Sequence, residues 1–199
     1  MKMKVREAAV RRQTAETQVR LKVNIDGTGM SSISTGVGFL DHMLTIFAKH
    51  SVIDLEVEVT GDLDVDSHHT VEDTGLLLGT AVREAIGDRA GIRRYGFFMV
   101  PMDESLASVA VDFSGRPCYV AKFTFPTQKI GTFDSELIRE FWQAFANTAM
   151  INLHQLVHYG QNSHHIAEAI FKATARAVRM ASEYDPRVVG IPSTKGSLD

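Results

Sequence analysis

The chain contains the pattern His-His-x-x-Glu twice. The first copy spans residues 68–72, and the second, at 164–168, begins 96 residues later (164 − 68). Each copy follows a short polar pair, Asp66-Ser67 or Asn162-Ser163, which is typical of the start of a helix. Imidazole nitrogen and carboxylate oxygen together suit divalent ions of the manganese, iron or zinc class. The two copies therefore predict metal chemistry.

Helix geometry decides which of these side chains can act together. In a helix, residues four apart lie on one face, so His68 lies on the same face as Glu72, and His164 on that of Glu168. Adjacent histidines diverge by about 100° and could serve two different ions. One such pattern could be a helix cap or a surface feature. Two copies in parallel contexts favour metal ligands on a duplicated half-domain.

The segments around the motifs also repeat. Upstream of each copy, alternating apolar residues predict strands, and apolar residues at helical spacing predict a helix. In the first half we expect strands at 17–25, at 30–35 (returning as a hairpin after Asp26-Gly27) and at 52–60, with a helix at 36–50. In the second half we expect strands at 97–101, 105–113, 118–125 and 151–159, with a helix at 134–150. Each motif then opens another helix.

This order predicts an α+β fold of two duplicated half-domains, each a small β-sheet with helices packed on one face. The halves would be residues 1–90 and 91–199, the second including a C-terminal loop, and together they would form one compact catalytic domain.

The repeat predicts one further ligand in each half. Aligning the halves on the strand-ending glycines Gly61 and Gly160 gives an offset of 99 residues (160 − 61). This offset places His42 opposite Phe141, the neighbour of Glu140. Each half could then add one ligand from its first helix, His42 in one and Glu140 in the other. The alternative for Glu140 is a solvated surface carboxylate.

Composition limits the class of protein. A chain of 199 residues with 44% hydrophobic content can bury a substantial core. Its net charge of −3 argues against a general nucleic-acid binder. The single cysteine excludes an intrachain disulfide and fits a reducing compartment. No apolar run approaches the roughly 20 residues that span a membrane, and no apolar signal segment opens the chain. We therefore expect a cytoplasmic protein with neither a nucleic-acid nor a membrane partner.

Many segments, in order, resemble one known family. From about Arg12 to Leu198 the chain resembles the imidazoleglycerol-phosphate dehydratases of histidine biosynthesis. The segments that carry the resemblance are residues 12–17, 36–43, 66–73, 91–96, 101–105, 112–117, 131–134, 162–165, 168–173 and 191–196. The family implies dehydration of imidazoleglycerol phosphate to imidazoleacetol phosphate. It also implies two manganese ions per active site and a homo-oligomeric 24-mer with active sites between subunits.

The resemblance assigns roles to individual residues. Many members have histidine where this chain has Glu140, and a carboxylate oxygen also suits manganese. The implied metal ligands are His42, His68, His69, Glu72, His164, His165 and Glu168, with Glu140 as the eighth. The implied phosphate-binding residues are Arg94, Arg116, Lys172, Ser193 and Lys195, each of which could alternatively be a solvated surface residue.

The reaction needs a carboxylate that moves protons, while the metals act as Lewis acids and as a template. By resemblance Glu16 is the first choice and Glu168 the second. Asp103 and Glu104 could orient ligand histidines, or could be ordinary turn carboxylates. Two other functions use the same ligands: a binuclear metallohydrolase acting on a phosphorylated heterocycle, and a non-catalytic metal-binding shell.

Overall fold

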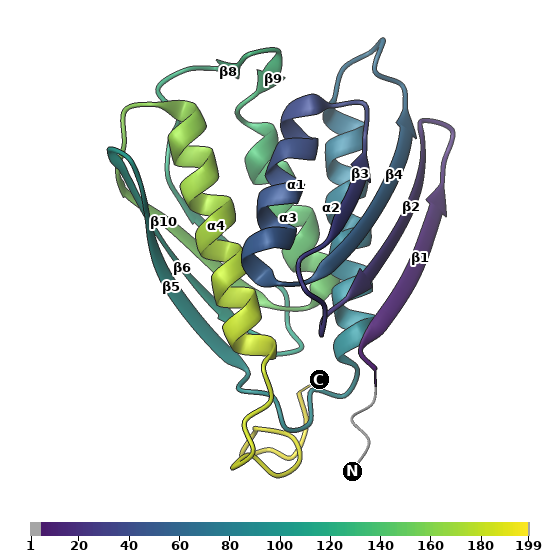
Figure 1. Ribbon diagram of the computed structural model, residues 1–199, viewed down its shortest axis with the longest axis vertical. Helices are drawn as coiled ribbons and strands as arrows, with labels where there is room; N and C mark the ends of the chain where they lie inside the picture. Colours follow the sequence, from purple (N-terminus) through teal and green to yellow (C-terminus); the bar gives the residue numbers. More distant parts are fainter. Residues whose placement is uncertain (1–4, 199) are drawn as a thin grey trace.

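The structure, a computed structural model, describes residues 5–198 and places four helices between two β-sheets (Figure 1). The first half contains β1 (Glu7–Gln13), β2 (Thr17–Asn24), β3 (Ser31–Ser34), α1 (Gly38–Ser51), β4 (Asp54–Gly61) and α2 (His68–Ile86). The second contains β5 (Tyr95–Met102), β6 (Ser105–Asp112), β7 (Cys118–Lys122), α3 (Leu137–Ala149), β10 (Asn152–Tyr159) and α4 (Ser163–Ser182). Two short strands, β8 (Lys129–Ile130) and β9 (Phe133–Asp134), precede α3.

The two sheets have the same topology. Their strand orders are β1-β2-β4-β3 and β5-β6-β10-β7, and in each sheet only the last pair is parallel. Each strand and helix of the first half thus has a counterpart in the second. The predicted α+β fold of duplicated half-domains is confirmed.

One predicted pairing is wrong. The segment 30–35 does not return as a hairpin, because β3 pairs in parallel with β4, Ser31 lying opposite Leu55. The side chain of Asp54 accepts hydrogen bonds from the backbone N–H groups of Thr28 and Met30, which directs the chain to the far edge of β4. The hairpin partner of β2 is β1, an edge strand that the sequence analysis did not predict.

The core lies where the helices meet between the sheets. Trp142 of α3 is fully buried, and its ring centroid lies 4.7 Å from that of Phe171 on α4 and 6.0 Å from that of Phe47 on α1. Helix α2 approaches α3 closely at Gly75 and Gly79, where the backbone of α3 occupies the space of a side chain. These contacts fix the four helices relative to one another.

Both motif helices begin in the same way. Asp66 accepts a hydrogen bond from the backbone N–H of His68, and Asn162 accepts one from His164. The connection into α2 is residues 62–67 and the one into α4 is residues 160–162. The second is three residues shorter, which equals the difference between the offsets of 99 residues for the glycines and 96 for the motifs. In Figure 1 both helices start at the end of the molecule opposite the C-terminal segment. None of the helices within residues 5–198 is long and apolar enough to cross a membrane.

Candidate metal centre and phosphate pocket

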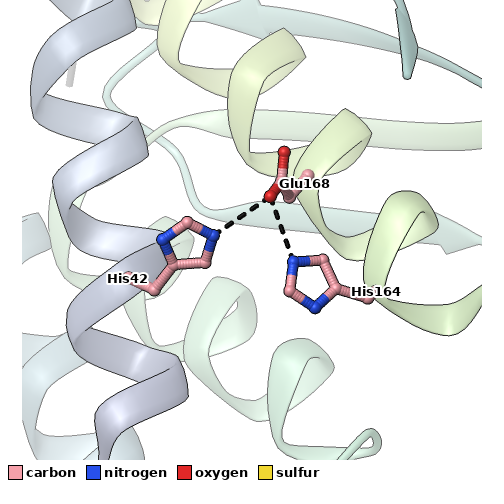
Figure 2. A group of neighbouring side chains, drawn as sticks. All are labelled: His42, His164 and Glu168. Atoms are coloured by element: carbon pink, nitrogen blue, oxygen red, sulfur yellow. Dashed lines mark hydrogen bonds and ion pairs between the residues drawn. The ribbon is translucent and has the colours of Figure 1, made fainter. Parts of the chain in front are cut away.

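Three of the predicted ligands meet between α1 and α4. His42 comes from α1, while His164 and Glu168 come from the first two turns of α4 (Figure 2). The Nε2 atoms of His42 and His164 lie 3.0 and 3.1 Å from the same Glu168 oxygen, Oε1. One ligand atom from each residue falls within 4.8 Å of the other two. A divalent ion could bind this cluster with only small side-chain movements.

Glu168 is kept ionised by its partners. Its side chain is only 10% exposed, and its second oxygen accepts a 2.6 Å hydrogen bond from Lys172 Nζ. Burial raises the pKa of Glu168, but hydrogen bonds from Lys172, His42 and His164 outweigh it and lower the pKa to about 2. Such a carboxylate suits a cation and is a poor proton acceptor near neutral pH. Its environment therefore favours the ligand role over the catalytic one.

The first motif has different neighbours. His69 Nδ1 lies 3.0 Å from Asp62 Oδ2, and its Nε2 lies 3.7 Å from Glu16 Oε1. The hydrogen bond to Asp62 raises the pKa of His69. The exposed Glu16, far from both motifs in sequence, therefore lies beside one of them. Sequence reasoning missed Asp62, although a carboxylate directly after the strand-ending Gly61 was a signal that could have found it.

His165, the counterpart of His69, is also held by a carboxylate. Its Nδ1 lies 2.6 Å from Glu104 Oε2, and its Nε2 lies 3.6 Å from Asp103 Oδ2. The hydrogen bond from His165, with backbone N–H groups including that of Asn162, holds the pKa of Glu104 well below its usual range. The same contact raises the pKa of His165. This geometry is consistent with Glu104 orienting a motif histidine, one of the two roles considered for it.

The remaining predicted ligands are less closely gathered. The ring centroids of His68 and His69 lie 6.1 Å apart, with an angle of 88° between the ring planes. The corresponding values for His164 and His165 are similar, 6.3 Å and 80°. Glu72 is partly buried on α2, and Glu140 is exposed in the first turn of α3, which packs on α2. Within residues 5–198 no hydrogen bond or ion pair joins Glu140 to the first motif. Its ligand role stays a prediction.

Four of the five predicted phosphate-binding residues line one open pocket of about 570 Å³: Arg94, Arg116, Ser193 and Lys195. The guanidinium of Arg94 donates two hydrogen bonds to Asp112, at 2.7 and 3.1 Å, and one to the carbonyl of Pro192 at 2.8 Å. Arg94 therefore anchors the C-terminal segment, while the exposed side chains of Arg116 and Lys195 leave cationic groups for an anion. Lys172 lies elsewhere, against Glu168.

The pocket and the His42 cluster lie at opposite ends of α4. The backbone N–H of Arg94 donates to the carbonyl of Ala181 in the last turn of α4, whereas His164 is in its first turn. Seventeen residues of helix separate His164 from Ala181, a rise of about 25 Å. One chain therefore carries a metal-type cluster and an anion-type pocket that a single small molecule cannot bridge.

Known proteins resemble this chain over nearly its whole length. A family model described as imidazoleglycerol-phosphate dehydratase matches residues 35–178. Enzymes of that name from Rhodopirellula baltica and Geobacter sulfurreducens are 58% and 57% identical over 193 residues, each covering 97% of this chain and 96% and 99% of the relative.

Solved structures agree. The crystal structure of imidazoleglycerol-phosphate dehydratase from Staphylococcus aureus has a TM-score of 0.82 and 40% identity, covering 90% of this chain and 99% of that one. The Pyrococcus furiosus structure has the same TM-score at 35% identity, covering 95% of this chain and 100% of that one. The chain belongs to the imidazoleglycerol-phosphate dehydratase family, a family of hydro-lyases.

Proposed function

We propose that this chain catalyses the manganese-dependent dehydration of imidazoleglycerol phosphate to imidazoleacetol phosphate in histidine biosynthesis. The observation that carries the proposal is the convergence of His42, His164 and Glu168 from two helices, in a chain of this family. Two imidazole nitrogens and an ionised carboxylate form a donor set that fits manganese. When bound, manganese would supply Lewis acidity and a fixed orientation for the substrate's imidazole ring.

Proton transfer is the part of the reaction that the chain itself must supply. Glu16 is exposed on the β1–β2 turn, and its carboxylate faces the first motif 3.7 Å from His69 Nε2. A solvent-accessible carboxylate at this place can take up a proton from substrate and release it to water. Glu168 is the weaker candidate, because its pKa of about 2 leaves it little basicity.

The separation of the two sites supports an assembly. The substrate carries a ring and a phosphate joined through a glycerol chain, so both ends must be bound close together. Because the pocket around Arg116 and Lys195 is about 25 Å along α4 from His164, we propose that neighbouring subunits bring the two together. The proposed assembly is the 24-mer that the family resemblance implies, with two manganese ions in each site.

The test is turnover of imidazoleglycerol phosphate by purified protein, first stripped of metal with a chelator and then reloaded with Mn²⁺. We expect the stripped protein to be inactive and the reloaded protein to form a ketone that retains its phosphate. Release of inorganic phosphate or of a ring fragment would instead indicate the metallohydrolase. Metal binding with no change in the substrate would indicate a non-catalytic shell.

A further inference from the structure

The second histidine of each motif is held on one side of its ring. Both His69 and His165 have a carboxylate at hydrogen-bond distance from Nδ1, at 3.0 and 2.6 Å. In each case Nε2 faces a different carboxylate beyond hydrogen-bond distance, at 3.7 and 3.6 Å. Two histidines 96 residues apart (165 − 69) have the same arrangement. This indicates that both rings need to be held in the same way.

We propose that Asp62 and Glu104 are positioning residues that hold the proton of His69 and His165 on Nδ1 and present the Nε2 lone pair to a divalent ion. An ionised carboxylate can only accept a hydrogen bond, so the contacting Nδ1 must donate. In a neutral ring the other nitrogen then carries the lone pair that a metal needs. The proposal rests on the proposed metal-dependent function.

Glu104 is itself rigidly held. Its Oε1 accepts hydrogen bonds from the backbone N–H groups of Gln161 and Asn162, at 3.1 and 2.8 Å, and from the hydroxyl of Ser105 at 3.1 Å. Its Oε2 is left for His165. The carboxylate of Glu104 therefore connects the β5–β6 turn to the start of α4 and also holds the ring of His165. A surface turn residue has no reason to make this set of contacts.

The two halves hold their histidine with carboxylates at different positions. Glu104 immediately precedes β6, and its counterpart Glu16 immediately precedes β2. In the first half Asp62 holds the histidine, and its backbone N–H donates to the carbonyl of Glu16 at 3.1 Å. The side chain of Glu16 is therefore not needed to hold the ring. The two equivalent glutamates therefore have different roles. Glu104 positions a ligand histidine, whereas the carboxylate of Glu16 is left free to transfer protons.

The experiment compares Glu104→Ala and Asp62→Ala with the unchanged protein, using ¹⁵N-histidine NMR on metal-free samples and Mn²⁺ titration by calorimetry. Glu58→Ala, which removes an exposed carboxylate paired with Arg20, is the control. At a pH above the raised pKa of both His69 and His165, so that both rings are neutral, we expect two rings with the proton on Nδ1 in the unchanged protein and one in each variant. We expect Mn²⁺ affinity to fall about 10–100-fold in both variants, and not in the control.

Glu104→Gln guards against a folding defect, because its single amide oxygen can still accept the hydrogen bonds of the loop, while its NH₂ group, a donor, replaces the oxygen that faces Nδ1. We expect it to keep the fold, to move the ring proton of His165 to Nε2, and to lower Mn²⁺ affinity as Glu104→Ala does. Unchanged tautomers and affinity in both alanine variants would overturn the positioning role. If the unchanged protein binds no Mn²⁺, the proposed function fails, while the tautomers of the metal-free protein still decide whether Asp62 and Glu104 set the ring.

Discussion

At the scale of single residues, Glu16 and Glu168 are two carboxylates in opposite environments. Glu168 is nearly buried and receives hydrogen bonds from Lys172 and two histidines, which lowers its pKa to about 2. Glu16 has a side chain 54% exposed and lies 3.7 Å from His69. A carboxylate kept ionised by its partners suits a cation, while an exposed carboxylate can exchange protons with water. This contrast supports the proposed ligand role of Glu168 and the proposed proton-carrying role of Glu16.

The Glu16→Gln variant tests that assignment. The change keeps size and hydrogen-bonding shape but removes the ability to carry a proton, so turnover should fall about 10²–10⁴-fold. Fold and metal content should be unchanged, because Glu16 is exposed on a turn. Turnover and bound metal are measured on the same preparation, with Glu58→Gln as the exposed-glutamate control. Near-normal turnover would transfer the catalytic role to Glu168.

His50 gives a pH-dependent prediction independent of catalysis. It lies in the last turn of α1, where burial and the charges of Lys172 and Arg176 lower its pKa. The folded state therefore resists protonating His50, while the unfolded chain takes up the proton near pH 6.5. Stability should fall as the pH decreases below about 6.5, because the unfolded state then binds more protons.

The measurement is the melting temperature of metal-free protein at about pH 7.5 and about pH 5.5. Between these two pH values, the melting temperature of the His50→Asn variant should fall less than that of the unchanged protein. His154→Asn, which removes an exposed histidine from β10, is the matched control. An equal loss in the His50 variant and the unchanged protein would show that His50 does not contribute.

At the scale of elements, the approach of α2 to α3 depends on glycine. A Cβ added at Gly79 would lie 2.3 Å from the carbonyl oxygen of Phe145 and 2.2 Å from the hydroxyl of Thr148. That hydroxyl already donates a 2.7 Å hydrogen bond to the carbonyl of Leu76 on α2. The two helices cannot separate without breaking this hydrogen bond.

We therefore expect Gly79→Ala to destabilise the protein by about 1–3 kcal/mol or more through overpacking, although alanine is the better helix former. Gly38→Ala, at the exposed start of α1 where a Cβ would meet nothing within 4 Å, should be neutral or slightly stabilising. Urea unfolding of both variants measures the difference. Equal unfolding midpoints would show that α2 and α3 can move apart at little cost.

Periodicity predicted all four long helices and most strands of the fold, because their buried faces repeat regularly. It failed for β1, an edge strand with half-buried alanine and valine between exposed residues, where apolar alternation is weak. It also failed for the pairing of β3, which depends on Asp54 receiving backbone N–H groups from a loop. Strand pairing set by a side chain leaves no periodic signal.

The candidate site divides in the same way. His42 and the second motif could be placed from spacing and from the internal repeat, and they do converge. The contacts of Glu104 with His165 and of Glu16 with His69 depend on which hairpin turn packs beside which motif helix. That proximity is decided by the sheet topology. Only the resemblance to a family singled out Glu16 in advance.

At the scale of the whole molecule, the metal-type cluster and the anion-type pocket of one chain lie far apart. The cluster of His42, His164 and Glu168 lies at one end of α4, and the pocket of Arg116 and Lys195 lies beyond the other end, near Ala181. Folding one chain more tightly cannot close this distance, because α4 is a rigid rod packed along its length. This separation supports the proposal that a second copy of the chain completes the site.

Mixed assemblies test this directly. A variant with both Arg116→Ala and Lys195→Ala should lose phosphate binding, and a Glu168→Ala variant should lose metal binding, so each should be inactive alone. When the two are unfolded together and reassembled in equal amounts with Mn²⁺, about a quarter of the sites should combine an intact cluster with an intact pocket from different chains. Turnover should recover in proportion, and light scattering should report a large homo-oligomer.

If each site were built within one chain, every chain in the mixture would stay defective and no turnover would return. Recovery that requires both variants, and neither alone, would show that the catalytic unit is the assembly.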